Sequence, residues 1–286
     1  MLYIYTAVVN NPKFIEMQHL TNKRFVKEDY KFIVYNDAKD WADYSNHNDI
    51  NIKKEIIKTC ERLNIECINI PNEHHKQVPG ASDRTAEACN YMLIDQRRIN
   101  DKALILDSDM FIVNDVNISE KYADYEMAIV PQKREKAARC FNQNTNQYEI
   151  IDVDYIWNGL AYFDMSIVKN KHLLDFNGFG GRCGITDTGG NMFYYLHGTP
   201  DAKIYNIQHL WSCTWDKNRF PNKLNTKLLD YLENDPKNQN DKFFAEIYDE
   251  YALHYRAGGN WEKLNREVHI KRTNMLWDTL VSIVKE

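Results

Sequence analysis

The stretch "ALILDSDMFIV", Ala103 to Val113, places two carboxylates, Asp107 and Asp109, between two apolar runs. The four apolar residues before Asp107 are typical of a strand that is covered on both faces of a parallel sheet. In open α/β sheets, ligands bind outside the carboxyl ends of the strands. The acidic tripeptide therefore lies where a binding site is expected, although a solvated acidic turn after a strand is the plain alternative.

The residues upstream alternate between strand and helix patterns. Strands are expected at four apolar runs, Leu2–Val9, Tyr30–Asp37, Ile65–Ile70 and Ala103–Leu106. Helices are expected between them: one begins with Asn11 as N-cap and Pro12 as first residue, one carries an apolar stripe over 52–63, and one covers 79–98. This alternation predicts an α/β fold with a Rossmann-like nucleotide-binding half and a mostly parallel sheet.

Downstream of the tripeptide the pattern is less regular. Two more strands are expected at Tyr125–Val130 and Ile156–Asp164, separated by a polar loop over Pro131–Asp154. A glycine-rich flexible segment over 177–190 and a short helix over 191–196 follow, and a final helix over 274–285 is expected to pack against the sheet. No repeat or linker divides the 286 residues, which favours a single domain.

Composition narrows the classes of function. Hydrophobic residues make up 43% of the chain and aromatic residues 13%, as in a globular protein. A formal charge of −5 argues against a general nucleic-acid binder, which needs a basic face. The six cysteines form no CxxC pair, which argues against a disulfide framework and a zinc finger. No targeting or membrane-spanning segment is evident, so the cytoplasm is the expected compartment.

The two aspartates favour a bound cation. Like charges held close raise each other's pKa unless a cation neutralises them, and Mg²⁺ or Mn²⁺ suits carboxylates that are shared with phosphate oxygens. A second motif, "ALHYRAGGNW", supplies His254, the cation Arg256 and a glycine turn whose amides can approach an anion. Together with Asp109, His254 would form a mixed site that suits Mn²⁺. A lone histidine that is simply packed is the alternative.

At this point the chain resembles a GT-A-fold glycosyltransferase that uses a nucleotide-sugar donor. "LILDSDMFIV" is similar to the DxD strand of that family, and "LHYRAGGNW" is similar to its late metal-binding histidine segment, nearest to family 8 enzymes of the glycogenin type. The resemblance implies one GT-A domain, with a nucleotide-sugar-binding half over 1–115 and a smaller acceptor-binding half, with the C-terminal helix, over 116–286. Family 8 members typically end the late motif with Lys-Pro-Trp, whereas this chain has Gly259-Asn260-Trp261, which leaves the exact family and the stereochemistry open.

The resemblance also implies roles for single residues. Asp109 and His254 would ligate the metal, and Asp107 would bind either the metal or the hydroxyl groups of the donor. The other implied donor-binding residues are Thr6, Ala7, Val8, Asn36, Asp37, Arg84, Ser108, Asn158, Gly159, Arg256 and Gly258. Two of these assignments have plain alternatives: Arg84 can form a surface salt bridge, and Asn36 with Asp37 can cap a turn.

On the acceptor side, the resemblance places Trp157 against a sugar face and adds Thr188. Asp187, in "GITDTGG", is the candidate catalytic carboxylate. It would act as general base in an inverting enzyme, or steady the oxocarbenium-like state in a retaining one, and a helix N-cap is its structural alternative. Core packing is the alternative for Trp157.

The resulting prediction is a metal-dependent transferase that moves a hexose-type sugar from a nucleoside diphosphate, with uridine diphosphate expected on the resemblance, to a hydroxyl acceptor. The segments 131–154 and 177–190 are expected to form an acceptor wall and a lid. A non-catalytic sugar- or nucleotide-binding protein is the main alternative. A haloacid-dehalogenase-like phosphatase is a weaker one, because Met110 and Phe111 follow the DSD here rather than the Gly-Thr or Thr-Val of those sites. The number of subunits stays open.

Overall fold

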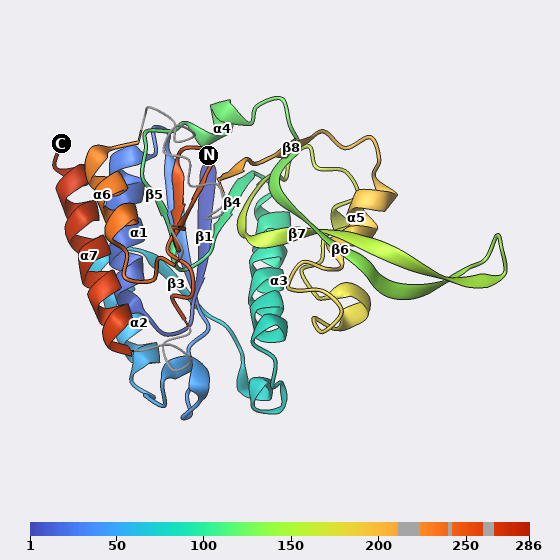
Figure 1. Cartoon of the computed structure of the whole chain (residues 1–286), viewed down its shortest axis with the longest axis horizontal. Coiled ribbons are helices and arrows are strands. Elements are labelled where there is room, and N and C mark those ends of the chain that lie inside the picture. Colours follow the sequence, from blue (N-terminus) through green and yellow to red (C-terminus); the bar gives the residue numbers. More distant parts are fainter. Residues whose placement is uncertain (211–223, 240–241, 260–265) are drawn as a thin grey trace.

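The computed structural model describes residues 1–210, 224–239, 242–259 and 266–286 (Figure 1). Its strands are β1 (Leu2–Val8), β2 (Tyr30–Asn36), β3 (Glu66–Asn69), β4 (Lys102–Leu106), β5 (Met110–Ile112), β6 (Met127–Asn142), β7 (Gln147–Asp164), β8 (Ile204–Asn206), β9 (His209–Leu210), β10 (Glu246–Tyr248) and β11 (Ala252–His254). Its α-helices are α1 (Pro12–Phe25), α2 (Ile52–Leu63), α3 (Ala81–Ile99), α4 (Ile118–Lys121), α5 (Met192–Gly198), α6 (Thr226–Asn234) and α7 (Arg266–Val284).

The described strands form two sheets. The larger has the order β3-β2-β1-β4-β7-β6-β8, in which β3, β2, β1 and β4 run parallel and β7 runs antiparallel to β4. The carboxyl ends of the four parallel strands therefore meet at one edge. The smaller sheet is antiparallel, with the order β5-β11-β10-β9. The predicted α/β class with a mostly parallel central sheet is confirmed.

Helices cover both faces of the large sheet. In Figure 1, α1, α2, α6 and α7 lie on one side of the sheet, and α3 and α5 lie on the other. Each side has its own core: Ile4, Phe14 and Leu280 belong to the first, and Tyr35, Met92 and Phe163 belong to the second. The parallel strands are thus buried on both faces, which explains their continuous apolar runs.

The start of α1 follows the sequence prediction. Asn11 accepts a hydrogen bond from the backbone N–H of Lys13, and Pro12 is the first helical residue. This cap ends β1 close to the sheet edge and turns the chain onto the face that α2 and α7 share. The short connection keeps the end of β1 beside the end of β4.

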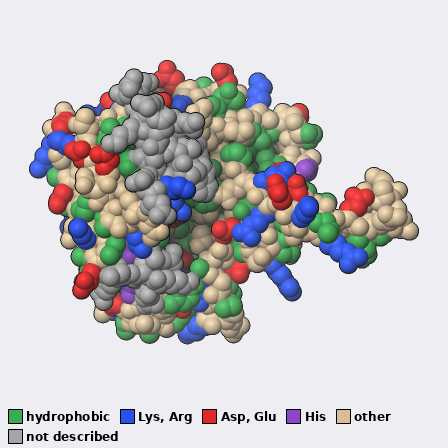
Figure 2. Space-filling view, in the orientation of Figure 1, with side chains coloured by type: hydrophobic (Ala, Val, Ile, Leu, Met, Phe, Trp, Pro, Cys, Tyr) green, Lys and Arg blue, Asp and Glu red, His purple; other side chains and the backbone are tan. Residues whose placement is uncertain are grey.

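The prediction of a polar loop in the second half is wrong. The polar segment 131–154 is no loop, because β6 and β7 pair through it as one long hairpin that reaches away from the body (Figure 1). Both faces of this ribbon are largely exposed, so the sequence shows no alternation of apolar residues. Figure 2 shows charged side chains of both signs along it. Lys133 and Asp152, on its two strands, form an ion pair at 2.8 Å.

The C-terminal helix is longer than expected and packs differently. It begins at Arg266 rather than Asn274, and its packing is mainly against α1 and α6 instead of directly on the sheet. Leu276, Leu280 and Ile283 are buried as expected. No helix in the described part of the chain is both long enough and apolar enough to span a membrane. The described cysteines, Cys60, Cys67, Cys89, Cys140 and Cys183, are free.

Candidate active site

The DSD tripeptide forms a tight turn between the two sheets. After β4 ends at Leu106, the backbone N–H of Met110 donates to the carbonyl of Asp107 at 3.1 Å, and β5 begins. The buried amide of Gln18, on α1, donates to the carbonyls of Asp107 and Met110 at 2.8 and 2.9 Å. The turn is therefore fixed from its inner side, and its carboxylates are set at the carboxyl edge of the parallel strands.

A second segment from late in the chain joins this turn. Strand β11 pairs antiparallel with β5, so that His254 lies opposite Met110, and the N–H of Tyr255 donates to the carbonyl of Asp109 at 2.9 Å. His254 Nε2 then lies 3.3 Å from Asp109 Oδ1. One potential ligand atom from each of Asp107, Asp109 and His254 falls within 4.8 Å of the others. The three residues can thus share one ion.

Glu246 orients the histidine, and the sequence analysis missed it. It lies directly opposite His254 in the β10–β11 pair, and its Oε2 is 2.9 Å from His254 Nδ1. The same oxygen accepts a hydrogen bond from the Tyr248 hydroxyl at 3.0 Å. A carboxylate on the far ring nitrogen is the usual support of a metal-binding histidine, because it fixes both the tautomer and the ring plane. An acid inside the apolar run "FFAEIY" was the available signal.

The charges in this cluster are unbalanced. Burial and the neighbouring Asp109 raise the pKa of Asp107 to about 6. Burial also disfavours the charged form of Asp109, but His254 and the N–H of Gly258 outweigh it and lower the pKa of that carboxyl. For His254, burial favours the neutral ring, yet Asp109 and Glu246 overcome it and raise its pKa to about 10. His254 therefore carries a proton that partly balances the charge of the neighbouring carboxylates, and a divalent cation in its place would balance more of that charge.

The donor set fits a hard or borderline divalent cation. Two carboxylates and one imidazole are ligands that Mn²⁺ accepts readily and that Mg²⁺ accepts in part. Gly258 supports this set at close range, since its N–H donates to Asp109 Oδ2 at 2.8 Å. A Cβ at Gly258 would come within 2.7 Å of the Cβ of Asp109 and within 2.6 Å of the ring of Phe14. Only glycine leaves room for this contact.

The cluster borders a cavity of about 340 Å³ at the carboxyl edge of β1, β2 and β4. Its wall includes ten of the predicted site residues, namely Ala7, Asp37, Arg84, Asp107, Ser108, Asp109, Trp157, Asn158, His254 and Gly258. Lys39, Tyr44, Ser45 and Cys89 also line it and were not predicted. A larger, open hollow beside Asn114 and Lys121 contains none of the acid and histidine ligands.

The remaining predicted residues lie off this wall. Thr6 and Val8 point into the interior of the sheet, and Asn36 bonds to the carbonyl of Lys53 and to Asn69. Gly159 contributes only its carbonyl, which accepts from the N–H of Asp107 at 2.8 Å.

Arg256 also lies off the wall. Its guanidinium is 3.4 Å from Glu246 and donates to the carbonyl of Phe244. Arg256 therefore balances the acid that orients His254, and the structure gives it no direct place at the cavity. Asn260 and Trp261, which end the late motif, lie outside the described residues.

Asp187 and Thr188 lie against the start of α3. The hydroxyl of Thr188 donates to the carbonyl of Ser82, in the first turn of α3, at 2.9 Å, and Asp187 Oδ1 accepts from the N–H of Thr188 at 2.8 Å. Asp187 is exposed and does not line the cavity. The residue at the N-cap position of α5 is Asn191, so the capping alternative for Asp187 does not hold either.

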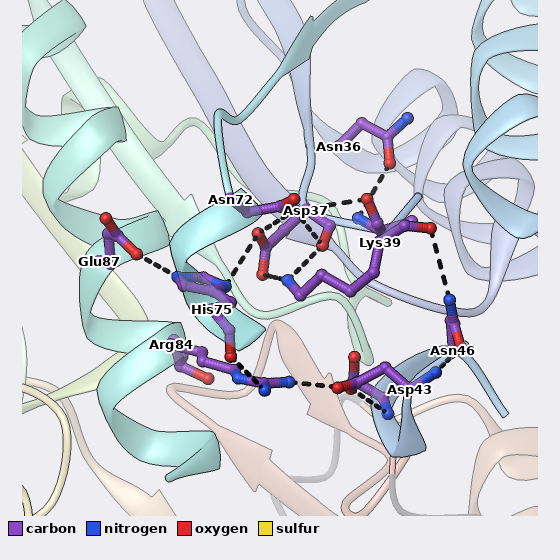
Figure 3. Close-up of polar contacts among 12 residues, drawn as sticks. Asn36, Asp37, Lys39, Asp43, Asn46, Asn72, His75, Arg84 and Glu87 are labelled. Atoms are coloured by element: carbon purple, nitrogen blue, oxygen red, sulfur yellow. Dashed lines mark hydrogen bonds and ion pairs between the residues drawn. The ribbon is translucent and has the colours of Figure 1, made fainter. Parts of the chain in front are cut away.

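Arg84 lies in a buried polar network (Figure 3) and lines the cavity. Its guanidinium donates to Asp43 at 2.8 Å and to the carbonyls of Val78 and His75 at 2.8 and 2.6 Å. Only 6% of Arg84 is exposed, so it is no surface salt bridge. These bonds engage three of the five guanidinium N–H groups and fix Arg84 in the cavity wall.

Asp37 and Lys39 form the second charged pair of this network (Figure 3). Lys39 Nζ lies 2.9 Å from Asp37 Oδ2 and is fully buried. Asn72 adds a donor to Asp37 Oδ1 at 3.0 Å. Because each charge has a partner, this network is a rigid floor rather than a set of free groups.

Trp157 belongs to both the cavity and the packing around the metal ligands. Its ring stacks on Tyr248 with centroids 5.3 Å apart and lies 5.0 Å from the ring of His254. The two interpretations made from the sequence, pocket wall and packed aromatic, therefore describe the same side chain.

No protein-family model and no curated protein matches the chain. Among solved structures, the mannosyltransferase PcManGT from Pyrobaculum calidifontis, in complex with GDP-Man and Mn²⁺, is similar with a TM-score of 0.41 and 9% identity over 72% of this chain and 54% of that chain. The apo structure of the bifunctional glycosyltransferase WbbM has a TM-score of 0.34 and 11% identity over 57% of this chain and 31% of that one. The galactosyltransferase LgtC, in complex with donor and acceptor sugar analogues, has a TM-score of 0.34 and 14% identity over 57% and 58%. The chain thus matches about half the length of PcManGT, and similarities this low establish neither a common fold nor a common activity.

Proposed function

We propose that the chain is a metal-dependent glycosyltransferase of the GT-A type, which moves a sugar from a nucleoside diphosphate to a hydroxyl acceptor. The observation that carries this proposal is the meeting of Asp107, Asp109 and His254 beside a cavity at the carboxyl ends of β1, β2 and β4. Ligands bind at this edge in open α/β sheets. The cavity has the size of a small-molecule site.

In this proposal Asp109 and His254 hold Mn²⁺ or Mg²⁺, and Asp107 either joins them or binds hydroxyl groups of the donor. The ion would offset the negative charge that builds on the departing diphosphate. Glu246 keeps the Nε2 of His254 directed at the site, and the network around Asp37 and Arg84 forms the end wall at which the nucleoside would lie. Uridine is proposed as the nucleoside on the family resemblance alone.

Trp157 would cover one face of the transferred sugar and exclude water from the ion. Asp187 remains our candidate for the carboxylate on the acceptor side, but it must move onto the wall to act there. Its segment is held to α3 by the Thr188–Ser82 hydrogen bond and by the N–H of Cys183, which donates to Asp83 Oδ1 at 3.2 Å. We further propose one transferase domain, in which 1–115 supplies most of the donor half and 116–286 most of the acceptor half.

Thermal denaturation with nucleoside diphosphates and their sugars, with and without Mn²⁺, tests the assignment. We expect one nucleotide to raise the melting temperature only when the metal is present. Asp109→Ala should abolish this effect, whereas Asp124→Ala, which removes an exposed aspartate outside the cluster, should retain it. The proposal is refuted if no nucleotide stabilises the chain in a metal-dependent way, or if Asp109→Ala responds like the wild type.

A binding protein without catalysis is the second candidate, and the position of Asp187 off the cavity wall favours it. It predicts the same metal-dependent stabilisation without turnover of the donor. Release of nucleoside diphosphate from the stabilising donor, measured with and without hydroxyl acceptors, separates the two. Turnover that is lost in Asp109→Ala identifies the enzyme, and its absence with every donor that binds identifies the binding protein.

A further inference from the structure

A second group of side chains that can bind a metal lies near Asp37, apart from the Asp107, Asp109 and His254 group. The 3₁₀ turn η2 (Glu73–Gln77) carries His74 and His75, and α3 carries Glu87. One potential ligand atom from each of the three residues lies within 4.8 Å of the others. His74 Nε2 is 2.6 Å from Glu87 Oε1, and His75 Nε2 contacts Glu87 Oε2 (Figure 3).

We propose that His74, His75 and Glu87 bind a divalent transition metal, with Zn²⁺ as the best fit, independently of the DSD site. Two imidazoles and one carboxylate are the protein ligands of a typical open zinc site, in which water takes the fourth position. Two of the three ligands are imidazoles, which argues against Mg²⁺ and Ca²⁺, since these ions prefer oxygen ligands. The proposal rests on these residues alone and does not require the proposed transferase activity.

The other nitrogen of His75 supports the assignment. The side chain of His75 is fully buried, and its Nδ1 has no hydrogen-bond partner among the described residues. The nearest anion to Nδ1 is Asp37 Oδ1 at 3.9 Å. If Nε2 binds a metal, Nδ1 carries the proton and faces a carboxylate, as metal-binding histidines usually do. If instead Nε2 carries the proton and donates it to Glu87, the buried Nδ1 is unprotonated, and its lone pair faces the carboxylate of Asp37.

The site is accessible and can adjust to an ion. His74 has half of its side chain exposed and borders an open hollow formed with Asp40, Asn72 and Gln77. In a tetrahedral site with bonds of about 2.0–2.1 Å, ligand atoms are roughly 3.4 Å apart. Glu87 must therefore move about 1 Å away from His74, and somewhat farther from His75, with which it is in closer contact. His75 is fully buried, whereas His74 and Glu87 are partly exposed and can make this movement. Without an ion, the two imidazoles contact Glu87 directly, and an ion between them would replace these contacts.

The location gives the metal a structural effect on the donor cavity. Bound zinc would tie η2 to α3 and fix His75 beneath Asp37, which lines that cavity. Arg84 already joins the same two elements, since it lies on α3 and donates to the carbonyl of His75. We therefore expect zinc to stabilise the floor of the cavity without contacting the ligand there.

Equilibrium dialysis of the chelator-treated chain against Zn²⁺, followed by metal analysis, tests the proposal. His74→Ala and Glu87→Gln should each bind one zinc fewer than the wild type, and His172→Ala, which removes an exposed histidine elsewhere, should bind as much as the wild type. Zinc should also raise the melting temperature of the wild type more than that of His74→Ala. Both variants change partly exposed side chains, so a folded protein is expected in each case.

Asp109→Ala separates this site from the first one. A zinc ion that His74→Ala loses and Asp109→Ala keeps supports the second site, even if no nucleotide binds and the proposed function fails. Equal zinc content in the wild type, His74→Ala and Glu87→Gln overturns it. So does a single zinc ion in the wild type that is lost only in Asp109→Ala.

Discussion

Binding of Mn²⁺ should strengthen steeply as the pH rises, because the ion must replace the proton on His254. A pKa of about 10 for His254 means that the ring is protonated at neutral pH in the metal-free chain. A metal binds only the neutral imidazole. At pH 7 the neutral form is about a thousandfold less populated than the charged one, since each pKa unit corresponds to a factor of ten. Proton competition therefore weakens the affinity for the metal by about that factor.

The raised pKa of His254 determines the direction of this pH dependence and the pH range over which it holds. A raised pKa keeps the proton on His254 until the pH approaches 10, so the dissociation constant should fall about tenfold per pH unit between pH 7 and 8. Below about pH 6 the slope should become steeper, because burial and Asp109 raise the pKa of Asp107 to about 6 and its proton must leave as well.

Isothermal titration with Mn²⁺ at several pH values measures this dependence. Repeating it in buffers with different ionisation enthalpies counts the protons released, and we expect close to one at pH 7.5. His254→Ala should bind the metal more weakly and lose most of the slope between pH 7 and 8. A wild-type affinity that does not change over this range would refute the reasoning, since either His254 would be neutral in the free chain or it would not be a ligand.

Two further substitutions test the support of this site. Glu246→Gln removes the charge beside Nδ1 and should lower the pKa of His254 by roughly one to three units, measured by NMR titration of the metal-free chain; an unchanged pKa would contradict the role given to Glu246. Gly258→Ala should reduce the free energy of unfolding in urea by about 1–3 kcal/mol, because the new methyl group overlaps Asp109. Gly259→Ala, whose Cβ would have its nearest neighbour at 3.5 Å, should cost less than about 0.5 kcal/mol, and equal losses in the two variants would contradict the packing argument.

The parallel half of the fold follows closely from the sequence, since its signals are local. Asn11 and Pro12 mark the start of α1, and the expected strands agree with β1 to β4 within about two residues. The β6–β7 hairpin was invisible because its stability comes from pairing between its own strands. Most residues of its outer part are exposed, with Ala138 and Val153 as buried exceptions, so no sustained hydrophobic alternation marks these strands.

The three proposed metal ligands were found from the sequence, and the residues that hold them in place were not. Asp109 and His254 stand out in the sequence because charged or imidazole groups interrupt apolar runs. Glu246 supports His254 through pairing between β10 and β11, and this register cannot be read from either short strand alone. Gln18 fixes the DSD turn from α1 through two carbonyls, and one amide on a helix gives no warning of such a role.

The C-terminal helix α7 also supports the site through a residue that the sequence did not indicate. Arg272 lies in the turns of α7 that the sequence prediction omitted, and its fully buried side chain pairs with Asp235 at 2.7 Å. It also donates to the carbonyl of Tyr255 at 2.6 Å and to that of Arg256 at 3.3 Å, the two residues that follow His254. Because these carbonyls belong to the turn that brings Gly258 to Asp109, the geometry of the ligand set depends on a helix that contributes no ligand. The N-terminal turns of α7 therefore help to position the proposed metal ligands as well as packing in the core.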